Sequence, residues 1–531
     1  MKIAVNRVLK NPNINILVAI FFLLVSIFLY KEAVLNGKMV WGQDTPKIVY
    51  PLAKLLDQSF KSHKFTLWTP DIYFGFPIGA EQGQYGLFYP PNLLHAVLPF
   101  ITSITVLSIF HFFLAAVATY AFSRLLKISR TGSVLAALAF MLNGFILSHQ
   151  QYLSHVYSYA YLPVEMFFVE FALQRKRLWP FTLAGSFLGL QFLTGHPNIA
   201  VMSAIALGIY IPIRVVIETS KHSKLLYLLK IAVLIFIPLL LVSLPYSSQL
   251  KTLLPLSIRA NGVDFQDATN SSISPYDFIT LIFPNFFFGS LKSTWAFAST
   301  WHFWGYWGQI ETTGYVGILT VVLFIISFSK KNLKRFLPFY AILLVSVLIG
   351  LGKNTPLYSN IFFKIPIFNG LRAPGKFFYL IDFSLAVLAA ISFDEFISIK
   401  NKVKLLVVAF FPILLLTITL AANLIFRFYP NQVYNLIDDG YSKLGYVPDL
   451  NDKNVLLGSV SYSLSNQTVI GIILSFLFAF ILINLYRTKS VFFKILLILL
   501  VTFDLLYFAL DINVWSSPAN FPGVENPTIQ N

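Results

Sequence analysis

Apolar runs of roughly 18 to 24 residues recur along the whole chain, and each is long enough to cross about 30 Å of hydrocarbon as a helix. Charged residues make up only 11% of the sequence and the mean hydropathy is +0.72, values far from those of a soluble domain. The pattern predicts an all-α polytopic membrane protein with about thirteen transmembrane helices. The predicted spans are 14–35, 101–125, 132–149, 155–173, 179–195, 198–217, 225–246, 310–328, 336–352, 375–397, 404–426, 464–486 and 492–511.

The first apolar run follows Lys2, Arg7 and Lys10, as the core of a signal peptide would. It continues past the length of a signal core and ends in Tyr30-Lys31-Glu32-Ala33 without a small-x-small cleavage site, so we interpret it as an uncleaved anchor. Cysteine is absent, which excludes disulfides and thiolate metal sites.

Lysines and arginines gather in every second connection between the predicted spans. These connections hold more than half of the 39 basic residues, whereas the opposite short connections around 149–154 and 195–197 hold none. The positive-inside rule therefore places the N-terminus in the cytoplasm and the C-terminus outside. The formal charge of +17 is then a topology signal in a lipid bilayer, and nucleic acid is not a predicted partner.

Every long connection falls on the external side in this topology. The connections are about 36–100, 247–309, 353–374 and 427–463, and a short external tail, 512–531, ends the chain. Cytoplasmic connections are too short to fold into an ATPase or nucleotide-sugar domain. We therefore expect residues 1–511 to form a single membrane domain, with any chemistry outside or within the membrane.

The first external connection begins with an acid in Trp41-Gly42-Gln43-Asp44-Thr45-Pro46. Thr45 and Pro46 favour a helix start, with a hydroxyl cap and a proline at the first helical position. An amphipathic interfacial helix is predicted to follow, with Ile48, Leu52, Leu55, Leu56 and Phe60 on its apolar face and Lys47, Lys54, Asp57, Lys61 and Lys64 opposite. Asp44 would stay ionised at its N-terminus, where it either serves chemistry or only caps the helix.

Glycines, prolines and aromatic residues follow in a definite order. The segments are Leu67-Trp68-Thr69-Pro70, Phe74-Gly75-Phe76-Pro77, Glu81-Gln82-Gly83-Gln84 and Gly86-Leu87-Phe88-Tyr89-Pro90-Pro91-Asn92-Leu93-Leu94. Together with Asp44, this order resembles the first external loop of the YfhO family, bacterial membrane proteins of the GT-C glycosyltransferase superfamily. The chain departs from that pattern at Thr69, where the family has Asn, and at Phe76, where it has Gly.

Further resemblance to the family lies downstream. The segments are Thr194-Gly195-His196-Pro197-Asn198, Glu311-Thr312-Thr313-Gly314-Tyr315-Val316-Gly317 and Leu371-Arg372-Ala373-Pro374-Gly375-Lys376. Asn198 replaces a glutamine of the family pattern and Lys376 replaces an arginine. The resemblance covers roughly residues 38–380. Many relatives continue into a further external domain, which we expect to be absent or dispensable here.

The resemblance implies a GT-C-like fold in the bacterial cytoplasmic membrane and transfer of a sugar from a polyprenyl-phosphate donor to an extracytoplasmic glycan, lipid or protein. Asp44 would be the general base. Arg372 and Lys376, four residues apart at the start of a span, would clamp the donor phosphate from one helical face, with His196 as a further phosphate ligand. Snorkelling cations and a helix-ending histidine are the structural alternatives. No cofactor is predicted, and a divalent metal has no support from ligand spacing.

Side chains for the sugar and the acceptor are expected among polar and aromatic residues of the external connections. They are Gln43, Trp68, Glu81, Gln84, His302, Trp307 and Glu311. The tryptophans equally suit an aromatic belt at the membrane interface. Glu165, Asp382 and Asp504 fall inside predicted spans, where an acid is functional or paired with a buried polar group.

Other functions stay open at this stage. A transporter or flippase for a lipid-linked glycan also has a dozen or more helices, although no half-to-half repeat is evident. A polyprenyl-linked glycan polymerase or ligase has external loops of a different arrangement. A membrane protein without enzymatic activity is the third alternative.

Overall fold

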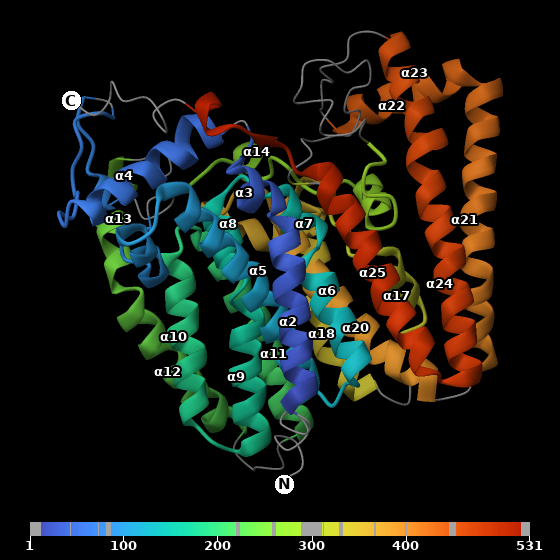
Figure 1. Ribbon diagram of the computed structural model, residues 1–531, viewed down its shortest axis with the longest axis horizontal. Coiled ribbons are helices and arrows are strands. Elements are labelled where there is room, and N and C mark those ends of the chain that lie inside the picture. Colours follow the sequence, from blue (N-terminus) through green and yellow to red (C-terminus); the bar gives the residue numbers. More distant parts are fainter. Residues whose placement is uncertain are drawn as a thin grey trace. The chain divides into compact units, whose positions relative to one another are not determined.

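The computed structural model describes residues 12–42, 44–72, 74–80, 86–218, 224–256, 262–287, 311, 313–328, 333–365, 368–398, 401–444 and 453–521. The chain divides into two compact units, coloured by sequence in Figure 1. Unit 1 comprises Met1–Lys127, His149–Val263 and Val514–Asn531, and unit 2 comprises Ile128–Ser148 and Asp264–Asn513.

The all-α fold class is confirmed, and within the described ranges ten helices are long and apolar enough to cross a membrane. These are Pro12–Leu29, Phe100–Leu125, Arg130–Ser148, Pro197–Ile217, Lys224–Val242, Leu333–Gly350, Pro374–Ser398, Lys402–Phe428, Lys453–Thr488 and Val491–Ile512. Each coincides with one of the thirteen predicted spans. The number thirteen itself is not confirmed.

Three predicted spans are shorter or broken, and prolines and glycines account for two of them. Span 155–173 divides into α8 (Leu153–Tyr159) and α9 (Leu162–Arg175), because Pro163 suits only the start of a new helix. Span 179–195 is the 15-residue α10 (Trp179–Leu193). In span 310–328 the described residues include the short helix α17 (Ile318–Ile325), which is entered through Gly317 at φ 85°.

Unit 1 packs its helices around α5. Its further elements are α2 (Pro12–Leu29), α3 (Lys31–Asn36), β1 (Met39–Val40), a π-helical turn (Thr45–Val49), α4 (Tyr50–Lys61), 3-10 turns at Ile78–Ala80 and Pro90–Ala96, α5 (Phe100–Leu125), α11 (Pro197–Glu218), α12 (Lys224–Val242), α13 (Ser247–Thr252) and β2 (Trp515–Ser516). Helix α10 packs on α9 and α12. A Cβ at Gly185 would lie 2.1 Å from the Ile235 carbonyl oxygen, so glycine permits the close approach of α10 and α12.

A two-stranded antiparallel pair joins the segment after α2 to the C-terminal segment. Met39 pairs with Ser516 and Val40 with Trp515. The Trp515 ring also lies edge-on against Tyr30, with 5.6 Å between the ring centroids. The segment around 515 therefore lies near the end of α2 that leads into β1.

The amphipathic helix predicted after Asp44 is present as α4, with one difference on its polar face. Leu52, Leu56 and Phe60 are buried as expected, against Ile78 and Leu87 of the same connection. Asp57, predicted on the exposed face, is only 1% exposed. Helical periodicity does not predict this burial, because the segments that cover Asp57 lie outside the helix.

Cations and a histidine surround the Asp57 carboxylate. The Lys61 ammonium lies 2.6 Å from it, Lys54 lies 3.6 Å away and His95 Nδ1 lies 3.9 Å away. His95 is itself hydrogen-bonded to the Ser103 hydroxyl at 2.7 Å. Burial lowers the pKa of His95 to about 4, although the Asp57 charge opposes that shift.

Unit 2 is centred on the buried helix α20 (Phe378–Ser398), which packs against α6, α17 and α18. Its other helices are α6 (Arg130–Met141), α7 (Gly144–Ser148), α14 (Phe265–Ala268), α18 (Leu333–Gly350), α19 (Pro356–Asn360), α21 (Lys402–Phe428), α22 (Pro430–Leu444), α23 (Lys453–Tyr462), α24 (Thr468–Thr488) and α25 (Val491–Ile512). Short turns lie at Pro275–Leu281, Gly352–Asn354, Phe362–Lys364, Phe368–Gly370, Pro374–Phe377 and Ser463–Gln467.

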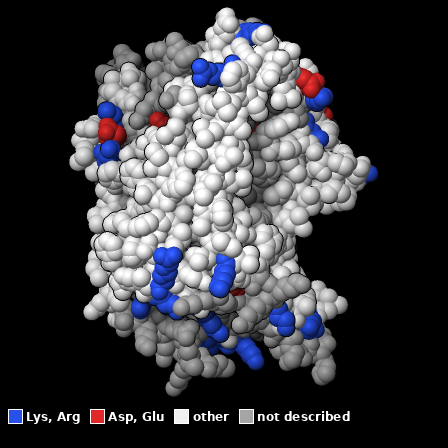
Figure 2. All heavy atoms as spheres, turned by 90° about the vertical axis from the view of Figure 1, so that its right-hand side faces the viewer, with Lys and Arg blue, Asp and Glu red and all other residues white. Residues whose placement is uncertain are grey.

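Helices α21 and α24 present a broad apolar surface. Leu406, Phe410, Leu414 and Phe480 are each more than half exposed. Figure 2 shows that the middle of this face is almost uncharged, with lysines and arginines toward its lower and upper ends. Such a surface is typical of helices that face lipid, with charged side chains near the two interfaces.

Candidate active site

Asp44 occupies a turn whose backbone is fixed by Thr45. The Gly42 amide donates to the Thr45 hydroxyl oxygen at 2.9 Å, and that hydroxyl donates back to the Gly42 carbonyl at 2.8 Å. Thr45 is fully buried, whereas Asp44 is half-buried. The predicted helix start at Thr45-Pro46 is thus present, although its first turn is π-helical.

The Asp44 carboxylate does not cap this helix. The Asp44 backbone carbonyl accepts from the Ile48 and Val49 amides, but its side chain makes no capping hydrogen bond. Instead, one carboxylate oxygen accepts a 2.7 Å hydrogen bond from the Tyr152 hydroxyl. Asp44 thus occupies the N-cap position without a capping hydrogen bond from its side chain, and its role in chemistry stays a prediction.

Close packing holds the two partner segments together. A Cβ at Gly42 would lie 1.8 Å from the side-chain oxygen of Gln151, so only glycine fits where the Asp44 turn crosses the segment that carries Tyr152. The Tyr152 amide donates to the His149 carbonyl at 2.9 Å, which closes a turn just before α8. Tyr152 is thereby directed at Asp44 by backbone as well as by side-chain contacts.

Three histidines extend the site from Tyr152. The Tyr152 and His155 ring centroids are 4.9 Å apart, and His155 also stacks on His149 at 4.9 Å. The His155 and His196 rings are closer still, at 3.6 Å. Contacts therefore run from Asp44 through Tyr152 and His155 to His196, all within unit 1. Two residues predicted for the site, Asp44 and His196, belong to one cluster.

Sequence reasoning missed Tyr152, His149 and His155. The signal was available in His149-Gln150-Gln151-Tyr152-Leu153-Ser154-His155, a connection between apolar runs that carries no lysine or arginine yet is rich in amide and aromatic polar groups. His149 and His155 are both buried, at 0% and 4% exposure. A buried polar connection of this kind indicates a site more strongly than a solvated turn does.

The cations predicted for the donor phosphate lie in unit 2, and their arrangement differs from the prediction. Arg372 precedes the 3-10 turn Pro374–Phe377 and is exposed, so it does not share a helical face with Lys376. The reason is Pro374, which disfavours a helical conformation at Ala373; that residue has φ 61°. The Lys376 ammonium lies 3.8 Å from the Glu311 carboxylate.

The backbone around Lys376 is tightly held. The Gly375 amide donates to the Ser271 carbonyl at 2.8 Å, and a Cβ at Gly375 would lie 2.6 Å from the Glu311 carbonyl. Ser271, like Ala373, has a positive φ, of 58°. Non-glycine residues in this region are strained and concentrate at functional sites. The role of this segment in phosphate binding stays a prediction.

Other predicted site residues do not join the Asp44 cluster. Trp68 is 56% exposed and its ring covers Gly75 in a small loop closed by the bridge between Thr69 and Phe76. Glu311 pairs with Lys376 as above. The remaining sugar or acceptor residues lie outside the described residues; they are Gln43, Glu81, Gln84, His302 and Trp307.

The acids inside the predicted spans are buried. Asp504 of α25 accepts hydrogen bonds from the Tyr315 hydroxyl and from the Ile318 amide, the first residue of α17. This carboxylate satisfies a helix end that would otherwise be unpaired, so Asp504 has a structural role. Asp382 of α20 faces the Phe145 amide of α7, and Glu165 of α9 is fully buried.

In the part of the chain that the structure describes, no group of three His, Asp or Glu side chains lies close enough together to bind a metal ion.

No protein-family model matches the chain. No curated protein matches it either. The resemblance to the YfhO family therefore stays a prediction.

Solved structures show some similarity to the chain. Arabinofuranosyltransferase AftD from Mycobacteria aligns with 14% identity and a TM-score of 0.43, over 86% of this chain and 26% of AftD. A mutant form of AftD gives 15% identity and a TM-score of 0.43. ArnT from Cupriavidus metallidurans, bound to undecaprenyl phosphate, gives 13% identity and a TM-score of 0.44 over 95% of this chain and 78% of ArnT. The chain thus spans about a quarter of the length of AftD.

Proposed function

We propose that this chain is an integral-membrane glycosyltransferase that moves a sugar from a polyprenyl-phosphate donor to an extracytoplasmic acceptor, with Asp44 as general base. The observation that supports it best is the Asp44 carboxylate. It lies just beyond the first long apolar helix and does not cap α4, and the Tyr152 hydroxyl orients it at 2.7 Å. A half-buried carboxylate held by one donor retains an oxygen with which to accept a proton.

In the proposed step, the acceptor hydroxyl oxygen attacks the anomeric carbon of the donor sugar. Asp44 takes the hydroxyl proton as the new C–O bond forms, and the bond from that carbon to the phosphate oxygen breaks. Polyprenyl phosphate leaves with the bonding electrons. A single displacement of this kind inverts the anomeric carbon.

The leaving phosphate needs cations or hydrogen-bond donors at membrane depth. Arg372 is exposed and offers a planar fork suited to a phosphate, whereas the Lys376 charge is partly compensated by Glu311 at 3.8 Å. We therefore assign the larger share of phosphate binding to Arg372. His196 of unit 1, beside the His155 ring, is the alternative phosphate ligand.

The test is release of polyprenyl phosphate from defined polyprenyl-phosphate sugars by purified protein in lipid nanodiscs. Wild-type protein should release the lipid phosphate, and Asp44→Asn should not. Tyr152→Phe should retain activity but lose roughly tenfold in rate, because a hydrogen bond to a charged group is removed without removing the base. Full activity in well-folded Asp44→Asn protein would contradict the proposal.

A transporter for a lipid-linked glycan is the second candidate, and broken helices in unit 2 favour it. The α6 and α7 helices are separate, and the Gly144 amide at their break donates to the Tyr315 carbonyl in the extended entry to α17 at 2.6 Å. Discontinuous helices are common at transporter sites. Movement of an intact fluorescent lipid-linked glycan across proteoliposomes, without release of lipid phosphate, would favour this candidate.

A further inference from the structure

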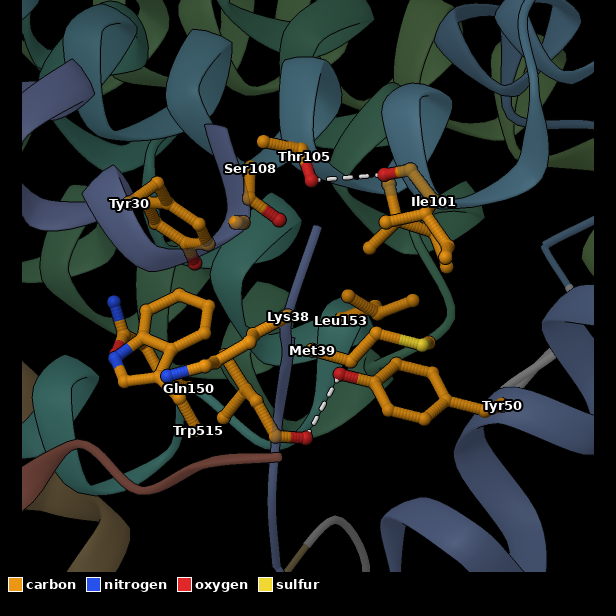
Figure 3. A pocket seen from close by; sticks show the side chains of 13 residues that line it. Tyr30, Lys38, Met39, Tyr50, Ile101, Thr105, Ser108, Gln150, Leu153 and Trp515 are labelled. Carbon is orange, nitrogen blue, oxygen red and sulfur yellow. Dashed lines mark hydrogen bonds between the residues drawn. The ribbon is translucent and has the colours of Figure 1, made fainter. Parts of the chain in front are cut away.

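A pocket in unit 1 is built from the same two segments as the Asp44 site. It is lined on one side by Lys38, Met39 and Val40, which lead into the Asp44 turn. On the other side it is lined by Gln150 and Leu153, which flank Tyr152. Tyr30, Tyr50, α5 and Trp515 complete the wall (Figure 3).

Two buried polar side chains in this pocket lack a hydrogen-bond partner. The Ser108 hydroxyl and both polar atoms of the Gln150 amide are unpaired, although these residues are only 1% and 2% exposed. The Tyr30 hydroxyl lies near both of them and the Tyr157 hydroxyl lies near Ser108, but these contacts do not have the geometry of a full hydrogen bond. Figure 3 shows Tyr30 and Gln150 on one side of the space and Met39 and Leu153 on the other. Unpaired polar groups in a folded protein are rare and call for an explanation.

The other hydroxyls of the wall are already used. Thr105 donates to the Ile101 carbonyl at 2.8 Å, and Tyr50 donates to the Val40 carbonyl at 2.9 Å. The only charged side chain in the lining is Lys38, and its ammonium is paired with Glu32 at 2.9 Å. The pocket therefore offers uncharged donors and acceptors, beside apolar and aromatic walls, with its one cation compensated.

We propose that this pocket is the acceptor subsite and that it seats a neutral hydroxyl group of the acceptor, with Ser108 and Gln150 as specificity-determining residues. The inference rests on the proposed function and deepens it. The free space at the centre, about 10 Å³, has the size of one water or hydroxyl group. An anionic group is disfavoured because the pocket holds no uncompensated cation, so the phosphate lies elsewhere.

The position of the pocket fits this role. Met39 and Val40 are joined to Asp44 through Gly42, and Gln150 is two residues from the Tyr152 that holds the carboxylate. An acceptor with one hydroxyl in the pocket would therefore lie against the two segments that form the contact between Asp44 and Tyr152.

The kinetic test compares variants of two serines on the same helix. Ser108→Ala should raise the KM for acceptor about fivefold and leave kcat nearly unchanged, because a neutral hydrogen bond to substrate is lost. Gln150→Leu should raise it roughly 10- to 100-fold, since two polar atoms are removed. The matched control is Ser123→Ala, because Ser123 is also a buried, unpaired serine of α5 but does not line the pocket.

Stability measurements separate this role from a structural one. Removing an unpaired buried hydroxyl should leave Tm unchanged or raise it in both Ser108→Ala and Ser123→Ala, so only the KM should distinguish them. An unchanged KM in both Ser108→Ala and Gln150→Leu would overturn the proposal. A fall in Tm with unchanged KM would show a structural role and would overturn it as well.

A binding experiment does not require turnover. Saturation-transfer NMR on the protein in nanodiscs should detect methyl β-glucoside with wild-type and Asp44→Asn protein and lose the signal with Gln150→Leu. Glucose 1-phosphate, the anionic probe, should give a weaker signal. Signals equal in wild-type and Gln150→Leu protein, or absent from wild type, would overturn the subsite. If binding depends on Gln150 but the protein transfers no sugar, the pocket is a binding site and the proposed function is wrong.

Discussion

Asp44 in unit 1 and Asp504 in unit 2 each accept a hydrogen bond from a tyrosine hydroxyl next to a helix start, and these two pairs are used differently. In unit 2, Asp504 is 2% exposed, accepts from Tyr315 and also accepts from the Ile318 amide at the start of α17. In unit 1, Asp44 is half-buried, accepts from Tyr152 and caps no helix. The Asp504 pair fixes backbone, whereas the Asp44 pair leaves the carboxylate accessible for chemistry.

The comparison teaches that the tyrosine alone does not mark a catalytic acid or base. The pairs differ in two properties of the carboxylate: how many further hydrogen bonds it can accept, and how exposed it is to a substrate. An amide donor at a helix N-terminus favours the ionised carboxylate and anchors it. A turn fixed by Thr45, in contrast, holds Asp44 without using its side chain.

The largest effect is expected on activity, which should depend on Asp44 and much less on Asp504. Asp44→Asn should lower sugar transfer on the order of 10² to 10⁴-fold if Asp44 is the base, while Tm stays close to that of wild type. The loss follows because an amide cannot accept the proton of the attacking hydroxyl. The measurement is release of polyprenyl phosphate together with a thermal melt. A large fall in Tm with normal specific activity would contradict this prediction, because Asp44 would then have a structural role like that of Asp504.

For Asp504 in unit 2 we expect the opposite result, a loss of stability and not of activity. Asp504→Ala should destabilise the protein by about 2–4 kcal/mol, because the Tyr315 hydroxyl and the Ile318 amide lose their acceptor inside the protein. Tyr315→Phe should cost less, since it removes only one bond. Thermal melts and activity per folded molecule check this. Activity lost without loss of stability would give Asp504 a catalytic role and break the comparison.

Much of the fold was readable from the sequence, because apolar length and charge alternation are local properties. Ten predicted spans coincide with long apolar helices. The broken spans depend on Pro163 and on Gly317 at φ 85°, which alter the backbone without lowering the hydropathy of the run. Among the described residues, therefore, an apolar run does not always form one continuous helix.

The site was only partly readable, for a reason that concerns distance along the chain. Asp44 could be found from its helix-start context. Its partner Tyr152 is 108 residues away, and their contact depends on Gly42 packing against Gln151. The predicted pairing of Arg372 and Lys376 on one helical face was wrong because Pro374 begins a new turn between them. Local patterns do not encode such packing.

A third prediction concerns the two cations of unit 2. Arg372→Ala should weaken donor binding roughly tenfold, and Lys376→Ala should weaken it less, because the Lys376 charge is shared with Glu311 at 3.8 Å. Arg372→Lys should recover only part of the loss, since an ammonium cannot form the bidentate contact. Binding of a fluorescent polyprenyl phosphate provides the measurement. Equal affinity in wild type and Arg372→Ala would move the phosphate site toward His196.

The smallest effect comes from pH and contrasts His95 of unit 1 with Asp277 of unit 2. Burial lowers the pKa of His95 to about 4, so between about pH 6.5 and 4 the unfolded chain binds a proton that the folded protein does not. His95 should therefore cost about 1 kcal/mol of stability as the pH falls from 6.5 to 5.5. Burial raises the pKa of Asp277 to about 7, so this group costs stability as the pH rises from about 4 to 7.

Between about pH 6.5 and 4, His95 and Asp277 change the stability with pH in opposite directions, and single variants distinguish their contributions. His95→Gln should make the protein less sensitive to acid between pH 6.5 and 5.5, whereas Asp277→Asn, which keeps an acceptor for the Ser274 amide, should make it more sensitive. Unfolding monitored in mixed micelles at several pH values gives both slopes. Identical pH profiles for wild type and His95→Gln would show that the pKa of His95 is not lowered in the folded protein. Attraction to the Asp57 carboxylate 3.9 Å away would then offset the effect of burial in the cluster that anchors α4.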